Sequence, residues 1–354
     1  MPKGTEVHVA VEVESEVSAA EWDEAIGRSD DTWLFHTAGW IELTARVWPL
    51  RNWFFVVRRG GRIVGGLAVQ LAPGGRRPWV RPQAYSIWMG TGGPFAVRDL
   101  DAKARHRVLD ALTEAVRQWA AQEGLAAVHC ALPPLAPNNL QNARGINPLV
   151  PFGWQDTSTH TRIRSLSQGC DLFDGLDPDA RRLCRRAVEA GYRVAREDWS
   201  EALDRYYELH QETYRRTGAT PHPREYFEGI ARTMGPRGHA VLWGCRNSSG
   251  QLVAFHNCGR YGQGAVYWTG CSQTADAKAG VNYLLMAHAI RAAAEEGFRY
   301  YDLGEAFPGT SDAKLRGLDR FKGKFGGQMY RFFRGRIDLP RRRPWPLGAG
   351  RKGR

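Results

Sequence analysis

Two apolar stretches of the sequence predict β-hairpins. Residues 53–69 read WFFVVRRGGRIVGGLAV, in which two apolar runs flank a Gly-Gly turn. Residues 239–257, HAVLWGCRNSSGQLVAFHN, repeat this pattern around an Asn-Ser-Ser-Gly turn. Glycine and asparagine tolerate the positive φ angles that tight turns need, so each stretch is typical of two antiparallel strands.

Each hairpin is followed farther along the chain by a long amphipathic helix with the same ending. Residues 108–124 (VLDALTEAVRQWAAQEG) and 281–297 (VNYLLMAHAIRAAAEEG) carry apolar residues at helical spacing. Their last residues, Gly124 and Gly297, are what we expect just beyond a helix end, where the backbone turns left-handed. The pattern predicts a short strand after each helix, over 125–132 and 298–304.

These elements form an internal repeat. Each half reads helix, hairpin, strand, helix, strand, at an offset of roughly half the chain. Residues 264–304 read β-α-β, which requires a parallel strand pair with a right-handed crossover. We therefore predict an α/β fold of two tandem domains, with mixed sheets flanked by helices. Chance similarity of two amphipathic helices is the alternative.

The domain boundaries follow from composition. The Pro- and Asn-rich segment 133–154 predicts a loop, and 159–166 (THTRIRSL) predicts a strand that leads into the second copy. We expect one domain at 1–165 and the other, with the active site, at 166–338. Residues 339–354 are rich in Pro and Arg with little to bury, so we expect a basic, disordered tail.

Composition narrows the class of protein. With 354 residues, 43% of them hydrophobic, the chain can build two cores, which excludes a disordered protein. The sequence has no run of 18 apolar residues and therefore predicts no membrane span, and its N-terminus shows no secretory signal. The six cysteines show no C-x-x-C pair and no metal-ligand spacing. We expect a cytoplasmic protein with reduced thiols, no metal and no stable membrane insertion.

The net charge of +12 favours a polyanionic ligand without demonstrating one. Residues 341–354 supply six of the positive charges, which is half of the excess. Of the 49 basic residues 42 are Arg, a bias that a GC-rich genome produces by itself. The sequence contains no G-x-S-x-G elbow, P-loop, H-E-x-x-H motif or complete dinucleotide fingerprint. Residues 259–264 (GRYGQG) predict a hairpin turn rather than a phosphate loop.

A basic helix is the first candidate site. Asp177 and Pro178 predict its start, and Gly191 predicts its end. Four arginines form a stripe on it that suits phosphate groups: Arg181, Arg182, Arg185 and Arg186. The alternative is a solvated face with ion pairs to Glu189 and its neighbours.

The β-α junction around residues 268–285 is the second candidate. A helix N-terminus offers free N–H groups to an anion or a carbonyl, and Gly280 allows a ligand to approach the backbone. Tyr267 and Trp268 on the preceding strand could form a pocket wall, with core packing as the alternative.

The third candidate is the segment from 300 to 332. Asp302 ends a predicted strand, and Lys322 and Lys324 lie in the Gly-punctuated sequence FKGKFGG. A lysine in such a loop can stabilise a developing oxyanion. The alternative is two exposed lysines on a strand edge.

Four sequence segments together resemble a known family. They are LFHTAGW (34–40), DARRLCRRAVEAGYRV (179–194), AAEEGFRYYDLG (293–304) and DRFKGKFGG (319–327). In this order they resemble the Fem-type (FemABX) aminoacyl-tRNA-dependent peptidyltransferases, which have a duplicated Gcn5-related N-acetyltransferase (GNAT) fold. The resemblance covers nearly the whole chain.

The resemblance implies an aminoacyltransferase that moves an amino acid from its tRNA ester to an amine and so forms an amide. The amine acceptor would be a peptidoglycan precursor or a small, specialised metabolite. The family's oxyanion lysine maps onto Lys322, preceded by Phe321, and the basic helix lies near the family's substrate groove. A tRNA ester is already activated, so no cofactor is required, and positioning with proton removal suffices.

Further residues are assigned on this basis. Asp302 is our candidate for holding or deprotonating the amine, with a strand-end cap as the alternative. His129 falls at the equivalent place in the first copy. Gly280 and Asn282 at the junction, and Lys324 beside the motif, are expected to contact substrate.

Two differences from the sequence patterns of related enzymes leave other functions open. An acyl-CoA-dependent GNAT enzyme usually carries Q/R-x-x-G-x-G/A at the β-α junction, but residues 277–282 (AKAGVN) keep only the central glycine. The long helical arm of some cell-wall Fem enzymes is also missing from the sequence pattern. Transfer from acetyl-CoA or another acyl-CoA is the alternative activity. A basic RNA-binding or scaffold protein without catalysis is the third hypothesis.

Overall fold

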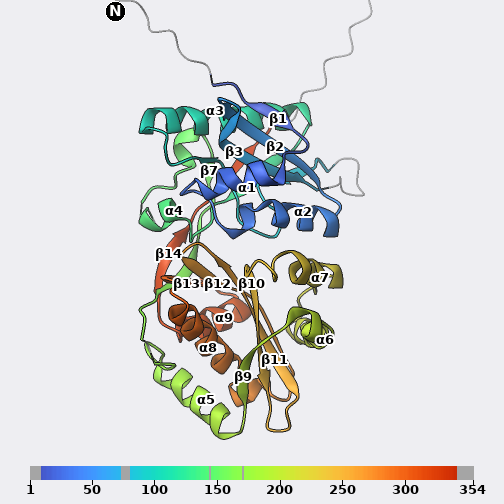
Figure 1. Ribbon diagram of the computed structural model, residues 1–354, viewed down its shortest axis with the longest axis vertical. Coiled ribbons are helices and arrows are strands. Elements are labelled where there is room, and N and C mark those ends of the chain that lie inside the picture. Colours follow the sequence, from blue (N-terminus) through green and yellow to red (C-terminus); the bar gives the residue numbers. More distant parts are fainter. Residues whose placement is uncertain (1–8, 73–79, 143–144, 170, 341–354) are drawn as a thin grey trace, which may run out of the picture.

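The chain folds into two mixed sheets, one above the other, each flanked by helices (Figure 1). The computed structural model describes residues 9–72, 80–142, 145–169 and 171–340. The predicted fold class, two mixed sheets covered by helices, is confirmed.

The first sheet has the strand order β1-β2-β3-β4-β6-β15-β7, and β5 pairs with β3. Its strands are β1 (Glu12–Glu14), β2 (Arg51–Arg59), β3 (Arg62–Leu71), β4 (Gln83–Tyr85), β5 (Phe95–Ala96), β6 (Ala127–Ala131), β7 (Gln155–Asp156) and β15 (Arg334–Asp338). The helices of this part are α1 (Ala19–Gly27), η1 (Leu34–His36), α2 (Ala38–Val47), α3 (Ala102–Gln122), α4 (Pro137–Gln141) and η2 (Val150–Phe152).

The second sheet has the order β14-β8-β13-β12-β11-β10-β9. Its strands are β8 (Thr159–Ser165), β9 (Arg193–Glu197), β10 (Ala240–Arg246), β11 (Leu252–Tyr261), β12 (Gly264–Ser272), β13 (Tyr300–Ala306) and β14 (Gln328–Phe332). Its helices are α5 (Pro178–Glu189), α6 (Trp199–Thr217), α7 (Arg224–Thr233), η3 (Ala277–Ala279), α8 (Val281–Glu295) and α9 (Ala313–Gly323).

The two predicted hairpins are confirmed as β2–β3 and β10–β11, and the predicted helices as α3 and α8. The continuous apolar run in β2 is explained by burial on both faces. Phe55 and Val57 join the core beneath α3, whereas Phe54 and Val56 join the core shared with α1 and α2. Gly124 and Gly297 have the expected positive φ angles, 69° and 87°.

Each sheet contains one short parallel ladder formed by the β-α-β unit. In the first sheet β4 runs parallel to β6, and in the second β12 runs parallel to β13. The last pair of the first ladder is Tyr85 with His129, and that of the second is Val266 with Asp302. His129 and Asp302 therefore occupy equivalent positions in the two copies.

The sheets divide the chain differently from the expected boundary at residue 165. The chain leaves the first sheet after β7 and enters the second at β8, so the crossing lies at residues 157–158. It returns at the end, because β15 inserts between β6 and β7 of the first sheet. The expected domain 166–338 thus gives its last strand to the other domain. The predicted loop 133–154 contains α4 and η2.

Of the expected tail, only the first two residues lie within the described structure. Leu339 is buried in the core of the first domain, and its N–H donates to the carbonyl of Ala126. Arg81 donates to the carbonyls of Leu339 and Pro340. Residues 341–354 lie outside the described residues.

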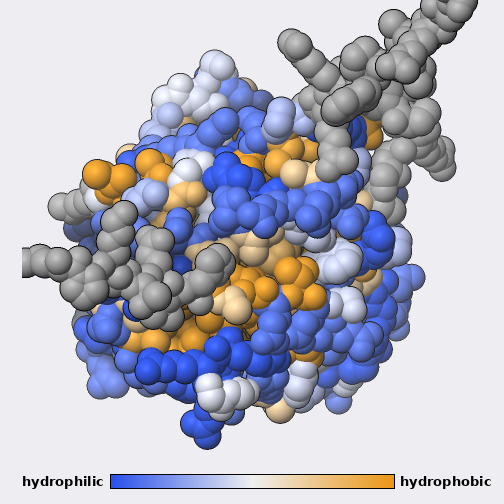
Figure 2. Space-filling view, turned by 90° about the horizontal axis from the view of Figure 1, so that it is seen from above, coloured by the Kyte–Doolittle hydropathy of each residue, from blue (hydrophilic) through white to orange (hydrophobic). Residues whose placement is uncertain are grey.

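One hydrophobic core spans both domains. It joins Trp22 and Trp40 of the first domain to Tyr206, Tyr226 and Phe227 of the second. Helix α2 lies directly on α7 at this junction (Figure 1). The end of the molecule formed by the first domain shows hydrophobic residues in the middle of a largely hydrophilic face (Figure 2).

Candidate active site

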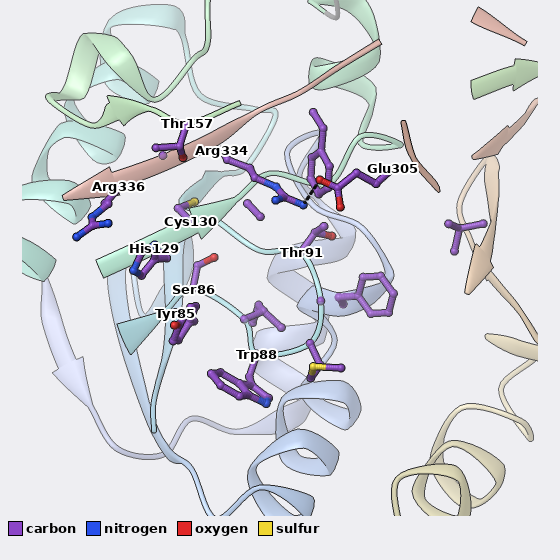
Figure 3. Close-up of a pocket in the computed structure, with 18 of the residues that line it drawn as sticks. Tyr85, Ser86, Trp88, Thr91, His129, Cys130, Thr157, Glu305, Arg334 and Arg336 are labelled. Carbon is purple, nitrogen blue, oxygen red and sulfur yellow. Dashed lines mark ion pairs between the residues drawn. The ribbon is translucent and has the colours of Figure 1, made fainter. Parts of the chain in front are cut away.

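A cavity of about 930 Å³ lies between the two domains. The first domain contributes β4, β6, β15 and the segment from Ser86 to Thr91, while the second contributes parts of β12 and β13 (Figure 3). Aromatic side chains make up much of the wall: Phe35, Tyr85, Trp88, Trp268 and Phe332. Sites for small molecules typically measure about 300–1,000 Å³, so this cavity is of the right size for one.

Strand register places a polar row on the cavity side of the first sheet. Tyr85 on β4 pairs with His129 on β6, and His129 pairs with Arg336 on β15. Residues paired across strands share one face of a sheet, and all three line the cavity. The rings of Tyr85 and His129 stack with centroids 5.0 Å apart, and His129 Nε2 lies 2.7 Å from Gln83 Oε1.

The positive charge of this row resides on Arg336. Burial, aided by the neighbouring Arg336 guanidinium, lowers the pKa of His129, so that the imidazole is neutral at pH 7. Arg336 forms an ion pair with Asp338 on its own strand at 2.7 Å, and both side chains remain partly exposed. Its guanidinium therefore keeps donors for an anionic group.

Three polar atoms around the cavity lack a hydrogen-bond partner among the described residues. They are Trp88 Nε1, Thr91 Oγ1 and Arg334 Nε. Thr91 is only 9% exposed. An unpaired buried polar atom costs about 1–3 kcal/mol. These three atoms have almost no accessible surface, so they lie behind the cavity surface and not on it.

Glu305 on β13 supplies the negative charge of the cavity. Arg334 Nη2 lies 3.1 Å from its carboxylate, and Thr159 Oγ1 donates to the same oxygen at 3.0 Å. Figure 3 shows Arg334 reaching across to Glu305, while Arg336 and His129 lie together at the opposite end.

Lys322 fills the space where β12 and β13 separate. The two strands pair at only three positions, the last being Val266 with Asp302. Lys322, in the last turn of α9, is 5% exposed and donates through Nζ to the carbonyl of Glu305 at 2.7 Å. The predicted loop is thus a helix end, and Lys322 is a buried lysine directly behind a residue that lines the cavity.

Asp302 balances the charge of Lys322. It is 5% exposed and accepts hydrogen bonds from Thr161 Oγ1 at 2.5 Å and from the Gly304 N–H at 2.8 Å. Burial raises the pKa of Asp302 and lowers the pKa of Lys322, and each charge opposes the shift of the other. The structure therefore brings together the two residues that the sequence singled out for catalysis.

The other residues expected near the catalytic site have different surroundings. Phe321 packs on Tyr283 and Phe325, with ring centroids 5.0 and 5.1 Å away, and fixes the end of α9 from within the core. Tyr267 and Trp268 both line the cavity, and the Trp268 N–H donates to the Tyr226 hydroxyl at 3.0 Å.

Lys324 points away from Lys322 and holds helix α5. Its ammonium lies 2.9 Å from Asp179 and 3.8 Å from Asp177, the cap of that helix. Helix α5 lies at the end of the second domain that points away from the first domain (Figure 1). Its four arginines are exposed: Arg181, Arg182, Arg185 and Arg186. Arg182 pairs with Asp179, and Arg185 packs over the ring of Phe173.

Helix α5 also covers the N-terminus of α8. Gly280 is buried with φ +92°, and a Cβ added there would lie 2.7 Å from the carbonyl oxygen of Leu183 on α5. Asn282 donates to Ser272 Oγ at 3.2 Å. The close approach expected of a ligand at Gly280 is thus made by a protein helix.

Sequence reasoning missed Glu305, Arg334 and Arg336. The pattern RGRID at 334–338 places both arginines on one strand face, which was a visible signal. Their position in the site depends on β15 crossing back to the first sheet, which no local pattern indicates. Within the described ranges, no cluster of side chains is arranged to hold a metal ion. No helix in the same ranges has the length and apolar character to cross a membrane.

Residues 178–322 match the family model described as an acetyltransferase (GNAT) domain. This match covers α5 to α9 and therefore most of the second domain. No curated protein sequence matches the chain.

Three solved structures show the same fold over nearly the whole chain. The crystal structure of FemX is 18% identical, with a TM-score of 0.69, and covers 93% of this chain and 97% of its own. The C-terminal domain of a putative lysylphosphatidylglycerol synthetase from Agrobacterium fabrum is 14% identical, with a TM-score of 0.57 and 90% coverage of both chains. A tandem GNAT protein from the clavulanic acid biosynthesis pathway is 16% identical, with a TM-score of 0.50, and covers 93% and 98%. The expected duplicated GNAT fold, similar to that of FemX, is confirmed.

Proposed function

We propose, from the tandem GNAT fold that the chain shares with FemX, that it is an aminoacyl-tRNA-dependent N-acyltransferase. It would transfer an amino acid from its tRNA ester to an amine and form an amide. The observation that carries this proposal is the buried Lys322, which lies behind Glu305 at the edge of a substrate-sized cavity.

The chemistry needs only groups that the site contains. The amine nitrogen attacks the ester carbonyl, the carbon–oxygen bond to the tRNA ribose breaks, and the ribose oxygen leaves with a proton that the amine gives up. The Lys322 ammonium would stabilise the oxyanion that forms in between. Asp302, close to Lys322, favours the charged form of that ammonium. Glu305 faces the cavity and can hold the substrate amine as its ammonium before the proton is lost.

The covered N-terminus of α8 supports tRNA over acyl-CoA as the donor. In acyl-CoA-dependent GNAT enzymes the pyrophosphate binds at this junction, but here Leu183 of α5 packs against Gly280. Val281, the first residue of α8, is fully buried. The exposed arginines of α5 suit a long polyanion instead. A charged tRNA as donor also places the reaction in the cytoplasm.

An acyl-CoA donor is the second candidate, and the match of residues 178–322 to the GNAT acetyltransferase model favours it. It requires α5 to move away from Gly280. Protection of residues 277–282 from hydrogen exchange by acetyl-CoA would support this alternative.

The decisive experiment compares the two donors directly. The full chain is titrated with a pool of charged bacterial tRNAs, with the same pool deacylated, and with acetyl-CoA, following tryptophan fluorescence. Charged tRNAs that carry a radiolabelled amino acid are then tested for transfer to a panel of amines. We expect tighter binding of charged than of deacylated tRNA, and label in an alkali-stable amide. Tight binding of acetyl-CoA, with tRNA binding that is equal for both pools and lost in salt, would overturn the proposal.

A further inference from the structure

A second cleft, of about 540 Å³, lies between the two domains beside the turn that joins β11 to β12. The first domain contributes the end of α1, the residues that follow it and helix α4, while the second contributes the turn and the start of β13. Trp33 Nε1 donates to the carbonyl of Tyr261 at 3.0 Å and so joins the two walls. Among the described residues, none lines both this second cleft and the cavity of the candidate active site.

One arginine from each domain lines the second cleft. Arg98 follows β5 in the first domain, Arg299 precedes β13 in the second, and both are exposed. Arg98 forms an ion pair with Asp30 at 3.3 Å, the one carboxylate among the described lining residues. Arg299 forms no ion pair with a described carboxylate, and its Nη1 donates to Gln263 Oε1 at 3.3 Å. The described lining therefore carries one positive charge in excess.

Aromatic and aliphatic side chains form much of the remaining wall. Tyr261 and Tyr300 are half-buried, and the guanidinium of Arg299 lies over the ring of Tyr300, 5.9 Å from its centroid. Further apolar side chains complete this part of the wall: Ile26, Trp33, Leu135 and Leu140. Sites for small molecules measure about 300–1,000 Å³ and combine apolar walls with a few polar groups, so the second cleft has the size and composition of one.

We infer that the second cleft binds an aromatic phosphate monoester, of which a mononucleotide is the common biological form. Its phosphate lies between Arg98 and Arg299 and accepts hydrogen bonds from both guanidinium groups. A phosphate monoester has three terminal oxygens and can accept from two arginines at once. Its aromatic ring packs on the tyrosines of the wall. This site is separate from the proposed catalysis, and the inference does not rest on the proposed function.

A ligand held by both arginines joins the two domains at a second place. Two elements of the second cleft also reach the cavity of the candidate active site. Strand β13 begins with Tyr300 at the cleft and carries Glu305 at the cavity, and Trp33 lies next to Phe35, a cavity wall, with ring centroids 5.7 Å apart. Because the ligand binds only the folded, joined domains, it should raise the temperature of unfolding.

The test measures binding to the full chain by isothermal titration calorimetry. The probes are AMP, GMP, CMP and UMP, the four matching nucleosides, and ribose 5-phosphate. We expect at least one mononucleotide to bind roughly tenfold or more tightly than both its nucleoside and ribose 5-phosphate, because each of these lacks one half of the contacts. If no mononucleotide binds, or if each binds no more tightly than its nucleoside or the sugar phosphate, the inference is wrong.

Variants locate the ligand. Arg299→Gln and Arg98→Gln should each weaken binding of the mononucleotide about tenfold and leave that of its nucleoside unchanged. Tyr300→Leu should weaken binding of both but not that of ribose 5-phosphate. Arg62→Gln, at an exposed position on β3 outside the cleft, is the matched control. A mononucleotide that binds Arg299→Gln and Arg98→Gln as tightly as the unmodified chain would show that the second cleft is not its site.

The mononucleotide can be free or can be the end of an RNA chain. Repeating the titration in the presence of deacylated tRNA distinguishes these two sources. Unchanged binding identifies a free mononucleotide as the ligand, and competition identifies the end of an RNA. Either result, together with the loss in the arginine variants, supports the phosphate site.

Discussion

At the scale of single residues, the charge of Lys322 is the property on which catalysis should depend. Its ammonium is buried, and the negative charges of Asp302, Glu305 and Asp319 oppose the effect of burial on its pKa. Replacing it by the uncharged, similarly sized methionine should reduce turnover by about 10²- to 10³-fold, the usual cost of losing one oxyanion donor. Binding of the acceptor amine, measured by calorimetry, should change little, because the Lys322 ammonium is assigned to the oxyanion and not to the bound acceptor. Unchanged turnover of a folded Lys322→Met variant would remove Lys322 from the mechanism.

The balance between Lys322 and Asp302 predicts a pH dependence. Burial lowers the pKa of Lys322 below the ordinary 10.5, and the Asp302 carboxylate raises it. Turnover that needs the ammonium is lost as the pH rises through this pKa. Asp302→Asn removes one of the charges that raise it, so the pKa falls further and the alkaline limb of kcat/KM moves to lower pH. A limb that stays in place, or moves upward, would show that Asp302 does not act on Lys322.

Gly304 is the residue that leaves room for the lysine. Its φ is +84°, and an added Cβ would lie 3.1 Å from Lys322 Nζ. Gly304→Ala should therefore displace the ammonium and also strain the backbone, which costs about 1–2 kcal/mol of stability for a left-handed alanine. Thermal unfolding and turnover are measured together, with Gly309→Ala as the control, since Gly309 also has a positive φ but open space around it. If both variants lose the same activity, crowding of Lys322 is not the cause.

At the scale of elements, helix α5 has two faces with different surroundings, and its sequence predicted only the exposed, basic one. Its apolar face packs on α8 and covers Gly280, while its arginines face solvent. Exchanging Arg181 and Arg185 for Glu should weaken tRNA binding and flatten its dependence on salt, because fewer counterions are released. Fluorescence titrations at several salt concentrations measure this, with Arg62→Glu on β3 as the control. A salt slope that matches the control would place the tRNA elsewhere.

The helices and strands show which parts of the fold could be predicted from the sequence. Hairpins, long helices and the cap of α5 follow from local patterns, and the structure confirms them. The segment FKGKFGG misleads because its glycines suggest a loop, although α9 continues to Gly323 under the packing of Phe321 and Phe325. Its two lysines diverge, one into the β12–β13 gap and one onto α5, since they leave the helix end in different directions.

Local sequence patterns do not predict which residues line the cavity. Arg334 and Arg336 belong to it only because β15 pairs with β6, about 200 residues earlier in the chain. Thr91 and Trp88 come from a segment without regular structure. Local periodicity does not predict where β15 or the segment with Trp88 and Thr91 lies in the fold. The equivalence of His129 and Asp302, by contrast, follows from the internal repeat, and the register of both sheets shows it.

At the scale of the whole molecule, a shared hydrophobic core packs the two domains against each other. Trp40 of α2 is fully buried between Phe35, Tyr226 and Trp268, with ring centroids 4.9, 5.9 and 5.0 Å away. Phe35 and Trp268 are also walls of the cavity, so packing between domains and the shape of the site depend on the same side chains.

This coupling predicts a single unfolding transition and a shared loss of stability. Trp40→Ala should destabilise the protein by about 3–5 kcal/mol, the usual cost of emptying a large aromatic site, and both domains should still unfold together. Differential scanning calorimetry measures the number of transitions, and Trp53→Ala serves as the comparison, because Trp53 packs on Trp119 in the first domain alone. Since Trp40 supports two cavity walls, its loss should also weaken binding of the acceptor amine, whereas Trp53→Ala should leave that binding intact. Two separate transitions in the unmodified chain would mean that the domains are independent and that the cavity between them can open and close.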